Sequence, residues 1–254
     1  MRIKFAVTVV VFLIIGYGCL HEGKSKTDQP NILFILVDDL GWADLGYTGS
    51  TFYETPNIDQ LASEGTVFTD AYAASPICSP SRAAIMSGKY PARLNLTDYI
   101  PGNRHYGPHK NQKLASHPFS LQLDLEEYTL AEVFKDAGYT TFFAGKWHLG
   151  EEEKYYPQYQ GFDINKGGNS TGHPAGGYFA PYKNPQLEDG KDGEYLTDRL
   201  TDETINFIKK NKNNPFFAYL SFYTVHLPMQ GKPEKVEKYR DKLSEMNYSG
   251  EEFI

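Results

Sequence analysis

The sequence predicts an α/β fold, with a mostly parallel mixed β-sheet sandwiched between layers of helices. Continuous apolar runs alternate with helical patterns along the chain, which is typical of parallel strands joined by helices. The apolar runs suit strands that are buried on both faces. Charged residues and histidines follow several of these runs by one to four positions. They stand where ligands bind in parallel sheets, beyond the carboxyl ends of the strands.

The composition of the 254-residue chain excludes two broad classes of protein. Hydrophobic residues make up 40% and aromatic residues 15%, which is too much for a wholly disordered chain. There are 25 Lys and Arg against 32 Asp and Glu, a net charge of −7, which excludes a basic nucleic-acid-binding domain. Two cysteines cannot form a disulfide framework, so each needs its own explanation.

Residues 1–19 are typical of a signal peptide. Arg2 and Lys4 precede an apolar run of about 11 residues and then small residues up to Cys19, and this run is shorter than the ~20 residues that span a bilayer. Cys19 stands where a bacterial lipoprotein carries its lipid, so lipidation and plain cleavage both stay open. Residues 20–29 are a polar tether. We expect an exported protein, periplasmic, secreted or held at the outer membrane only through Cys19.

The N-terminal part of the domain at 30–254 begins with a strand and a short helix. Residues 31–37 (NILFILV) are continuously apolar and predict the first strand. A helix is predicted at 58–63, because Thr-Pro-Asn precedes it and Gly65 follows it. Residues 66–73 read as a second strand.

Glycines end the next two predicted helices. The first covers 79–87, with Pro80 in its first turn and Gly88 at its end. The second covers 129–137 and ends at Gly138. Its apolar face consists of Leu130, Val133, Phe134 and Ala137.

The C-terminal part has two strands, a long helix and two aperiodic stretches. Strands are predicted at 139–144 and 215–223, and the longest helix at 196–211. The inward residues of this helix are expected to be Leu196, Leu200, Ile205 and Ile208. Residues 93–127 and 151–195 lack periodicity and are expected to form loops around a pocket. Loop histidines are pocket candidates, although solvated positions are the simpler interpretation: His105, His109, His117 and His173.

Two neighbouring carboxylates, Asp38 and Asp39, end the first strand. Such a pair repels itself unless a cation or a shared proton lies between the two groups. Hard divalent cations prefer oxygen ligands. The pair therefore indicates a Ca²⁺ site, with Mg²⁺ as the alternative, although an isolated Asp-Asp is more often a solvated turn.

The segment Cys78-Ser79-Pro80-Ser81-Arg82 predicts an anion site. Cys78 stands at the start of a predicted helix, where free N–H groups and the helix dipole favour an anion. Arg82 lies four residues later, on the same side of the helix. Lys146, His148 and His226 each follow a predicted strand, so we expect all of these side chains to converge at one edge of the sheet.

These motifs resemble the N-terminal portion of the type I, arylsulfatase-like sulfatases of the alkaline phosphatase superfamily. The resemblance runs from Pro30 to the end of the chain. Its motifs stand in the family's order: PNILFILVDDLG at 30–41, TPNIDQLASEG at 55–65, CSPSR at 78–82, GKWHLG at 145–150 and VHLP at 225–228.

The resemblance implies a set of roles. A maturation enzyme would oxidise Cys78 to formylglycine, whose hydrate would contact a cation bound by Asp38 and Asp39. Arg82 would hold the hydrate and Lys146 would bridge it to the sulfate. His148 would take a proton from the second hydroxyl, and His226 would contact the sulfate and help protonate the leaving oxygen.

The resemblance also predicts that the chain is incomplete. Family members are longer, with a further pair of metal ligands, another lysine and a C-terminal subdomain after the position that matches His226. The sequence after this position has no such pair or lysine, so we expect the 254-residue chain alone to bind Ca²⁺ weakly and to have little or no activity.

The expected activity is hydrolysis of sulfate esters of carbohydrates or aryl alcohols. Two alternatives stay open: a phosphonate or phosphate ester hydrolase of the same superfamily, and an exported remnant that binds without catalysis.

Overall fold

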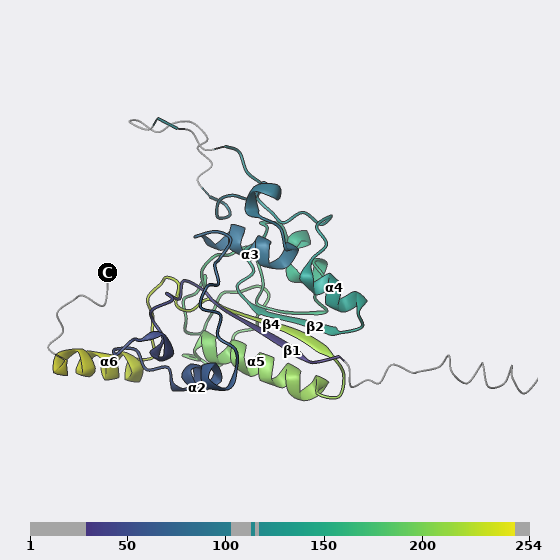
Figure 1. Ribbon diagram of the computed structural model, residues 1–254. Coiled ribbons are helices and arrows are strands. Elements are labelled where there is room, and N and C mark those ends of the chain that lie inside the picture. The colour runs from purple at the N-terminus through teal and green to yellow at the C-terminus, as the bar shows by residue number, and fades with distance from the viewer. Residues whose placement is uncertain (1–28, 103–112, 115–116, 247–254) are drawn as a thin grey trace, which may run out of the picture. The chain divides into compact units, whose positions relative to one another are not determined.

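The computed structural model describes residues 29–102, 113–114 and 117–246 (Figure 1). The expected signal peptide with Cys19 lies outside these residues, as do His105 and His109. A compact unit begins at Ile32. None of the described helices is both long and apolar enough to cross a bilayer.

The central sheet of this unit is parallel, which confirms the predicted fold class. Its four strands are β1 (Ile32–Val37), β2 (Thr140–Gly145), β3 (Ile164–Lys166) and β4 (Phe216–Phe222). They lie in the order β1-β4-β2-β3, and all three neighbouring pairs are parallel. Because parallel strands end at the same edge, the residues that follow β1, β2 and β4 are brought together.

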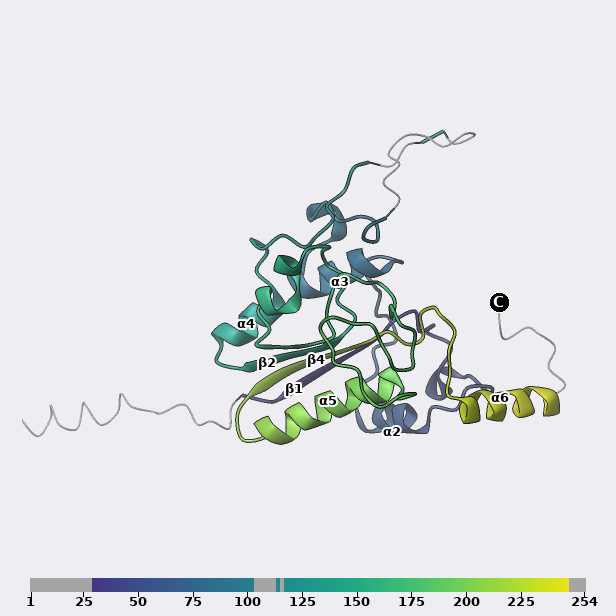
Figure 2. The same ribbon diagram turned by 180° about the vertical axis from the view of Figure 1, so that it is seen from behind.

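Helices cover both faces of the sheet. In Figures 1 and 2, α3 (Cys78–Ser87) and α4 (Leu130–Asp136) lie over one face, and α5 (Leu196–Asn211) lies over the other. The remaining helices are α2 (Pro56–Glu64) and α6 (Pro233–Glu245). Single 3₁₀ turns are found at Gly46–Thr48, Pro91–Arg93, Glu153–Tyr155 and Pro157–Tyr159.

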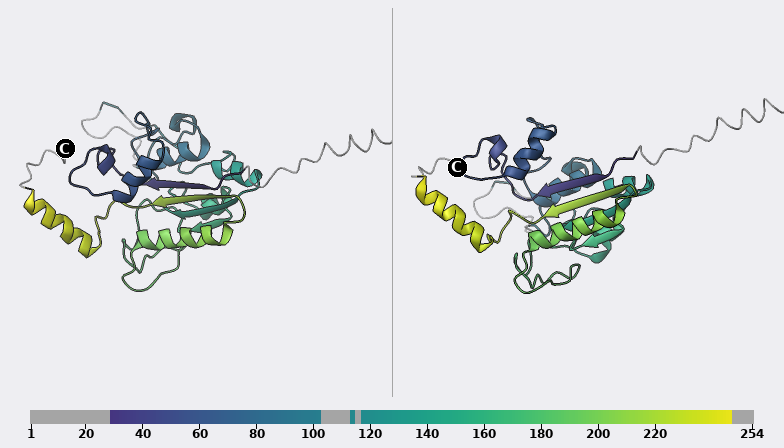
Figure 3. Two further views of the ribbon diagram at one scale, coloured as in Figure 1. Left: turned by 60° about the horizontal axis from the view of Figure 1, so that its bottom comes forward. Right: turned by 90° about the horizontal axis from the view of Figure 1, so that it is seen from below.

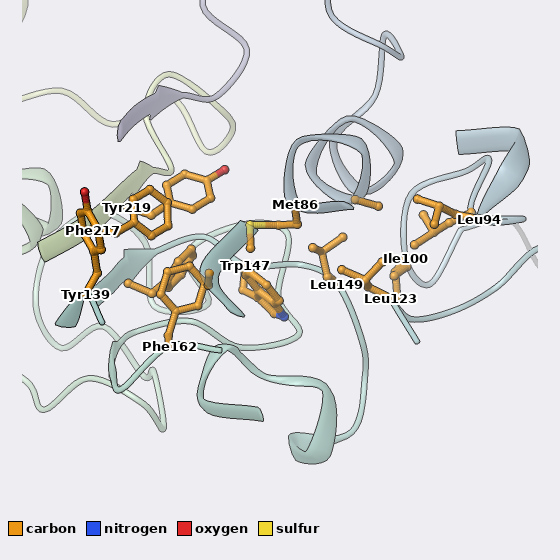
Figure 4. Close-up of a cluster of buried hydrophobic side chains, with 14 residues drawn as sticks. Met86, Leu94, Ile100, Leu123, Tyr139, Trp147, Leu149, Phe162, Phe217 and Tyr219 are labelled. Carbon is orange, nitrogen blue, oxygen red and sulfur yellow. The ribbon is translucent and has the colours of Figure 1, made fainter. Parts of the chain in front are cut away.

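Alternating strand residues build one core on each face of the sheet. Phe143, Phe217 and Tyr219 belong to the core on the α3 and α4 side. Figure 4 shows this core, where Met86 from α3 points toward Trp147. The neighbouring strand residues Phe142, Ala144, Phe216, Ala218 and Leu220 pack with α5 in the second core. The two cores hold the strand ends, and the side chains that follow them, in a fixed arrangement.

Most predicted elements are present, because capping residues and apolar periodicity mark them clearly. The helix predicted at 196–211 has the bounds of α5, and α3 ends at Gly88 in the left-handed conformation. Thr129 caps α4 in a capping box with Glu132. Strand β3 and helix α6 were not predicted from the sequence.

The prediction of a strand at 66–73 is wrong. This segment is irregular, and Val67, Phe68 and Tyr72 are 43%, 79% and 88% exposed. A strand requires a neighbour with which to pair, and no described strand pairs with this segment.

The prediction that the first strand is buried on both faces is also wrong. Leu33 and Ile35 are 44% and 47% exposed, because β1 is at the edge of the described sheet and α5 lies on β4 and β2 (Figure 3). In α5 itself, Phe207 and not Ile205 is buried.

The cap of α4 yields a prediction for stability. The buried Thr129 Oγ1 accepts from the Glu132 N–H at 3.2 Å and donates to the Gln160 carbonyl at 2.9 Å. Thr129→Ala should therefore lower the free energy of unfolding by about 1 to 2 kcal/mol, measured by urea denaturation.

Thr201→Ala is the matched control, because the Thr201 hydroxyl donates only to the Thr197 carbonyl within α5. We expect a change of less than about 0.5 kcal/mol. Equal losses in the two variants would contradict the role of the cap.

Candidate active site

The end of β1 positions the two aspartates differently. The Asp38 N–H donates to the Thr224 carbonyl at 3.0 Å, and the Val225 N–H donates to the Asp38 carbonyl at 2.7 Å. These bonds hold Asp38 against the chain that follows β4, and its side chain is buried. Asp39 adopts a left-handed conformation with φ of 58°, and its side chain is 61% exposed.

Helix α3 carries Arg82 into the interior below Cys78. The Arg82 Nη2 donates to Asp38 Oδ1 at 3.1 Å, and Nη1 donates to the Lys146 carbonyl at 2.6 Å and to Ser221 Oγ at 2.7 Å. A rigid guanidinium fork suits this arrangement of acceptors. Arg82 thus connects α3 to the ends of three strands, β1, β2 and β4.

The start of α3 is fixed by a buried serine. Ser79 Oγ donates to the His148 carbonyl at 2.9 Å and accepts from the Ile100 N–H at 3.0 Å. It therefore joins three segments far apart in sequence: the helix that Cys78 begins, the segment at Ile100, and the turn that contains His148.

A glycine turns the chain inward after β2. Gly145 has φ of 106°, and a Cβ at this position would lie 1.9 Å from the Ser221 carbonyl oxygen. Only glycine allows this close approach. The next residue, Lys146, donates its N–H to the same carbonyl at 2.8 Å, is fully buried, and forms an ion pair with Asp38.

Among the described ion pairs, Asp38 is the only acidic partner of Arg82 and of Lys146. Burial would raise the pKa of Asp38, but Arg82 and Lys146 outweigh burial and hold it below its ordinary value. Burial lowers the pKa of Lys146, Arg82 lowers it further, and Asp38 compensates only in part. The result is a fixed positive field beside the carboxylate.

His148 follows Lys146 closely and is held neutral. It has φ of 61°, its N–H donates to the Asn169 carbonyl at 3.1 Å, and its ring Nε2 bonds to the Ile100 carbonyl. Burial lowers the pKa of His148 to about 4, and the positive charges of Lys146 and Arg82 contribute. With Nε2 bonded to a carbonyl, Nε2 carries the proton, so Nδ1 presents a lone pair.

Nδ1 of His148 is buried and has no hydrogen-bond partner in the described structure. Gly172 lies against the same ring, and a Cβ there would come within 2.8 Å of Nδ1. An unpartnered buried acceptor is uncommon in folded proteins and is found where function requires it.

His226 lies near Asp39 beyond the end of β4. Its Nε2 is 3.8 Å from Asp39 Oδ2, which is too long for a hydrogen bond. Its Nδ1 is 2.9 Å from the Leu227 carbonyl, and the Tyr178 hydroxyl donates to the His226 carbonyl at 2.9 Å. The ring is partly exposed, so it is accessible to a ligand.

Four predicted site residues line one cavity of about 690 Å³, which we name the Cys78 cavity. They are Asp39, Cys78, His148 and His226. Asp38, Arg82 and Lys146 are buried and are not part of its lining.

Several residues of this site were not predicted from the sequence. Ser221 Oγ accepts a hydrogen bond from Arg82, and Tyr223 places a buried hydroxyl near the same charges. Loop residues complete the Cys78 cavity: Pro76, Ile77, Tyr99, Ile100, Pro101, Glu151, Ser170, Thr171, Gly172 and His173. The aperiodic stretches predicted that loops would form the pocket, but gave no signal for the individual residues other than His173.

The carboxylate oxygens of Asp38 and Asp39 suit a hard cation, but they are fewer than the ligands that such a cation usually takes. Each Asp38 oxygen accepts one hydrogen bond and retains a lone pair, and Asp39 is exposed. Ca²⁺ usually takes six to eight oxygen ligands. Within the described ranges, no three His, Cys, Asp or Glu side chains gather closely enough to hold a metal ion.

Comparison with known proteins identifies the family of this chain. The family model described as Sulfatase matches residues 30–248. The chain belongs to the sulfatase family. N-acetylgalactosamine-6-sulfatase of Mus musculus is 34% identical over 245 residues, which cover 87% of this chain and 44% of that protein. The chain thus spans less than half the length of this relative.

Solved structures show the same fold over most of this chain. Ps i-CgsB in complex with k-i-k-neocarrahexaose has a TM-score of 0.66 and 33% identity, covering 84% of this chain and 49% of that one. BT4656 in complex with its substrate D-glucosamine-2-N,6-O-disulfate has a TM-score of 0.63 and 26% identity. The match covers 84% of this chain and 38% of that one. The chain thus spans less than half the length of each of these two structures.

The ion pairs of this sulfatase chain yield a second prediction. Asp38→Asn leaves Arg82 and Lys146 buried without a countercharge, so the free energy of unfolding should fall by about 3 kcal/mol. Asp39→Asn is the control, because Asp39 is exposed and its loss should change stability by less than about 0.5 kcal/mol. Chemical denaturation of both variants measures the difference, and similar losses would contradict the account.

The environment of His148 yields a third prediction, for pH. The folded pKa is about 4 and the ordinary value is about 6.5. Between these two pH values, the unfolded chain therefore binds more protons than the folded chain. The contribution of His148 to the free energy of unfolding is constant above pH ~6.5 and falls by about 3 kcal/mol as the pH drops to ~4.

His148→Gln keeps a neutral donor toward Ile100 and should remove this part of the pH dependence. NMR titration of the ring should give a midpoint near 4. A midpoint above about 6 would contradict the described burial of the ring.

Proposed function

We propose that the full-length protein to which this chain belongs hydrolyses sulfate esters of carbohydrates, with a formylglycine made from Cys78 as nucleophile. The observation that carries the proposal is the convergence of Asp39, Cys78, His148 and His226 on one cavity. The ion pairs of Asp38 with Arg82 and Lys146 lie beside it. A sulfate monoester requires a nucleophile, positive charge for its oxygens, and an acid for the departing alcohol.

Three similar proteins support a carbohydrate substrate. The similar solved structures are in complex with k-i-k-neocarrahexaose and with D-glucosamine-2-N,6-O-disulfate. The mouse relative is an N-acetylgalactosamine-6-sulfatase. Because all three names refer to sugars, we favour sulfated carbohydrates over simple aryl sulfates, and sulfatase activity over phosphonate or phosphate ester hydrolysis.

Two groups would supply chemistry that the unmodified chain lacks. Hydrated formylglycine at position 78 would supply two hydroxyls on one carbon, one as the nucleophile and a second whose deprotonation would allow the sulfate to leave. Asp38 and Asp39 would hold the divalent cation, Ca²⁺ or alternatively Mg²⁺, that lowers the pKa of a bound hydroxyl. Further ligands are required to complete its coordination.

The residues of the chain would divide the remaining tasks. Arg82 is fixed by three hydrogen bonds, so it orients the group at position 78 and supplies a permanent positive charge. Lys146 supplies the second charge toward the sulfate oxygens. His148, held neutral, accepts a proton at Nδ1. His226, which is partly exposed, contacts the sulfate and protonates the leaving oxygen.

Export of the protein belongs to the same proposal. The sequence of residues 1–19 supports a signal peptide that is removed, with lipid attachment at Cys19 or simple cleavage as the two outcomes. In the periplasm, at the outer membrane or outside the cell, an unmodified Cys78 would be open to oxidation. A formylglycine-generating enzyme that acts on Cys78 would remove this thiol.

A fourth prediction tests the proposed chemistry. After coexpression with a formylglycine-generating enzyme, mass spectrometry of the peptide containing Cys78 should show loss of the thiol and gain of an aldehyde. The full-length protein should hydrolyse an aryl sulfate much faster than a matched aryl phosphonate. Cys78→Ala should reduce turnover by about 10⁴-fold or more, because the nucleophile is lost.

Cys78→Ser is the matched variant and should be equally inactive unless a maturation enzyme modifies serine. The 254-residue chain alone should show little or no turnover. An unmodified thiol at position 78 in an active full-length enzyme would refute the proposed nucleophile.

A further inference from the structure

A second cavity adjoins the Cys78 cavity. This outer cavity has a volume of about 770 Å³, and His173 and His226 line both cavities. The two cavities therefore meet at these two histidines. One wall of the outer cavity consists of residues 173–177 and the other of residues 226–230.

The two walls of the outer cavity are tied together by a buried tyrosine. The Tyr178 N–H donates to Gln230 Oε1 at 2.8 Å, and its hydroxyl donates to the His226 carbonyl at 2.9 Å. The Tyr195 hydroxyl donates to the Gln230 carbonyl at 3.1 Å. These bonds hold the two walls of the outer cavity in place, so little ordering of the walls is required when a ligand binds.

The outer cavity differs from the Cys78 cavity in charge. The Cys78 cavity includes Asp39 and Glu151 in its lining. None of the described residues that line the outer cavity is Lys, Arg, Asp or Glu. The described lining of the outer cavity thus offers no fixed charge to pair with a second anion.

The lining of the outer cavity combines apolar surface with a few polar groups. Leu227 and Met229 are 63% and 79% exposed, and Pro174 and Pro228 lie beside them in the lining. Gln230 and the two histidines add hydrogen-bonding groups. Sugar rings present apolar C–H faces together with hydroxyl groups, so an uncharged sugar matches this surface better than a charged one.

We propose that the outer cavity is a subsite for an uncharged sugar unit next to the sulfated unit held in the Cys78 cavity. The preferred substrate is then a sulfated oligosaccharide or polysaccharide whose neighbouring unit carries no carboxylate. This inference rests on the proposed function of the Cys78 cavity.

Binding to the 254-residue chain with unmodified Cys78 tests the proposal without turnover. Three probes are compared by calorimetry or NMR: N-acetylgalactosamine 6-sulfate, a chondroitin 6-sulfate tetrasaccharide, and the same tetrasaccharide with its carboxyl groups reduced to alcohols. We expect the reduced tetrasaccharide to bind about fivefold more tightly than the monosaccharide and about threefold more tightly than the native tetrasaccharide.

A charge substitution in the outer cavity sharpens the test. Met229→Lys should remove or reverse the preference for the reduced tetrasaccharide, because the new cation pairs with the carboxylates. It should leave the affinity for the monosaccharide within about twofold. Met246→Lys is the matched control, because Met246 ends α6 and is not part of the lining, and it should change none of the three affinities.

Equal affinities for the monosaccharide and both tetrasaccharides would overturn the outer subsite and leave the sulfatase proposal intact. Tighter binding of the native tetrasaccharide by the unsubstituted chain would overturn the preference for an uncharged unit. Failure of all three sulfated probes to bind would overturn the outer subsite, whereas the proposed function is tested separately by turnover of an aryl sulfate by the full-length protein.

Discussion

The contact on which the rest of this site depends is the pairing of one buried carboxylate with two buried cations. Asp38 accepts from Arg82 and Lys146, which come from α3 and from the turn after β2. Burial of either cation without Asp38 would be costly. This charge triad joins three elements that are far apart in sequence and fixes where α3 begins. Cys78 is therefore placed at the edge of the sheet by electrostatics as much as by apolar packing.

The backbone around this triad adopts conformations that are unfavourable in isolation. Asp39 and His148 are non-glycine residues with φ near 60°, each of which costs on the order of 1 kcal/mol. The hydrogen bonds of Asp38 to the chain after β4, and of His148 to Asn169, hold these turns in place. Strain at two neighbouring turns of one cavity is common where side chains are held for function.

Much of the fold could be predicted from sequence because its signals are local. Apolar runs mark β1, β2 and β4, and glycines mark the ends of α3 and α4. The exposed segment 66–73 was predicted as a strand because alternation does not reveal whether a pairing partner exists. The short strand β3 and the charged helix α6 lack a strong apolar pattern.

Only those site residues that belong to sequence motifs could be predicted. The motifs identified the residues that gather at the strand ends, because parallel strands bring their carboxyl ends together. They did not reveal that Asp38 pairs with both Arg82 and Lys146. Nor did they identify Ser221, Tyr99 or Gly172, because contacts between segments tens of residues apart leave no periodic signal.

One contact of His148 couples the loop at Ile100 to proton affinity. The ring bonds the Ile100 carbonyl, and Tyr99, Ile100 and Pro101 all line the Cys78 cavity. A molecule that pushes this loop aside breaks the bond that stabilises the ring proton. By thermodynamic reciprocity, the loop position and the protonation of His148 must influence each other equally. A bulky ligand in the cavity that displaces this loop would therefore change the pKa of His148.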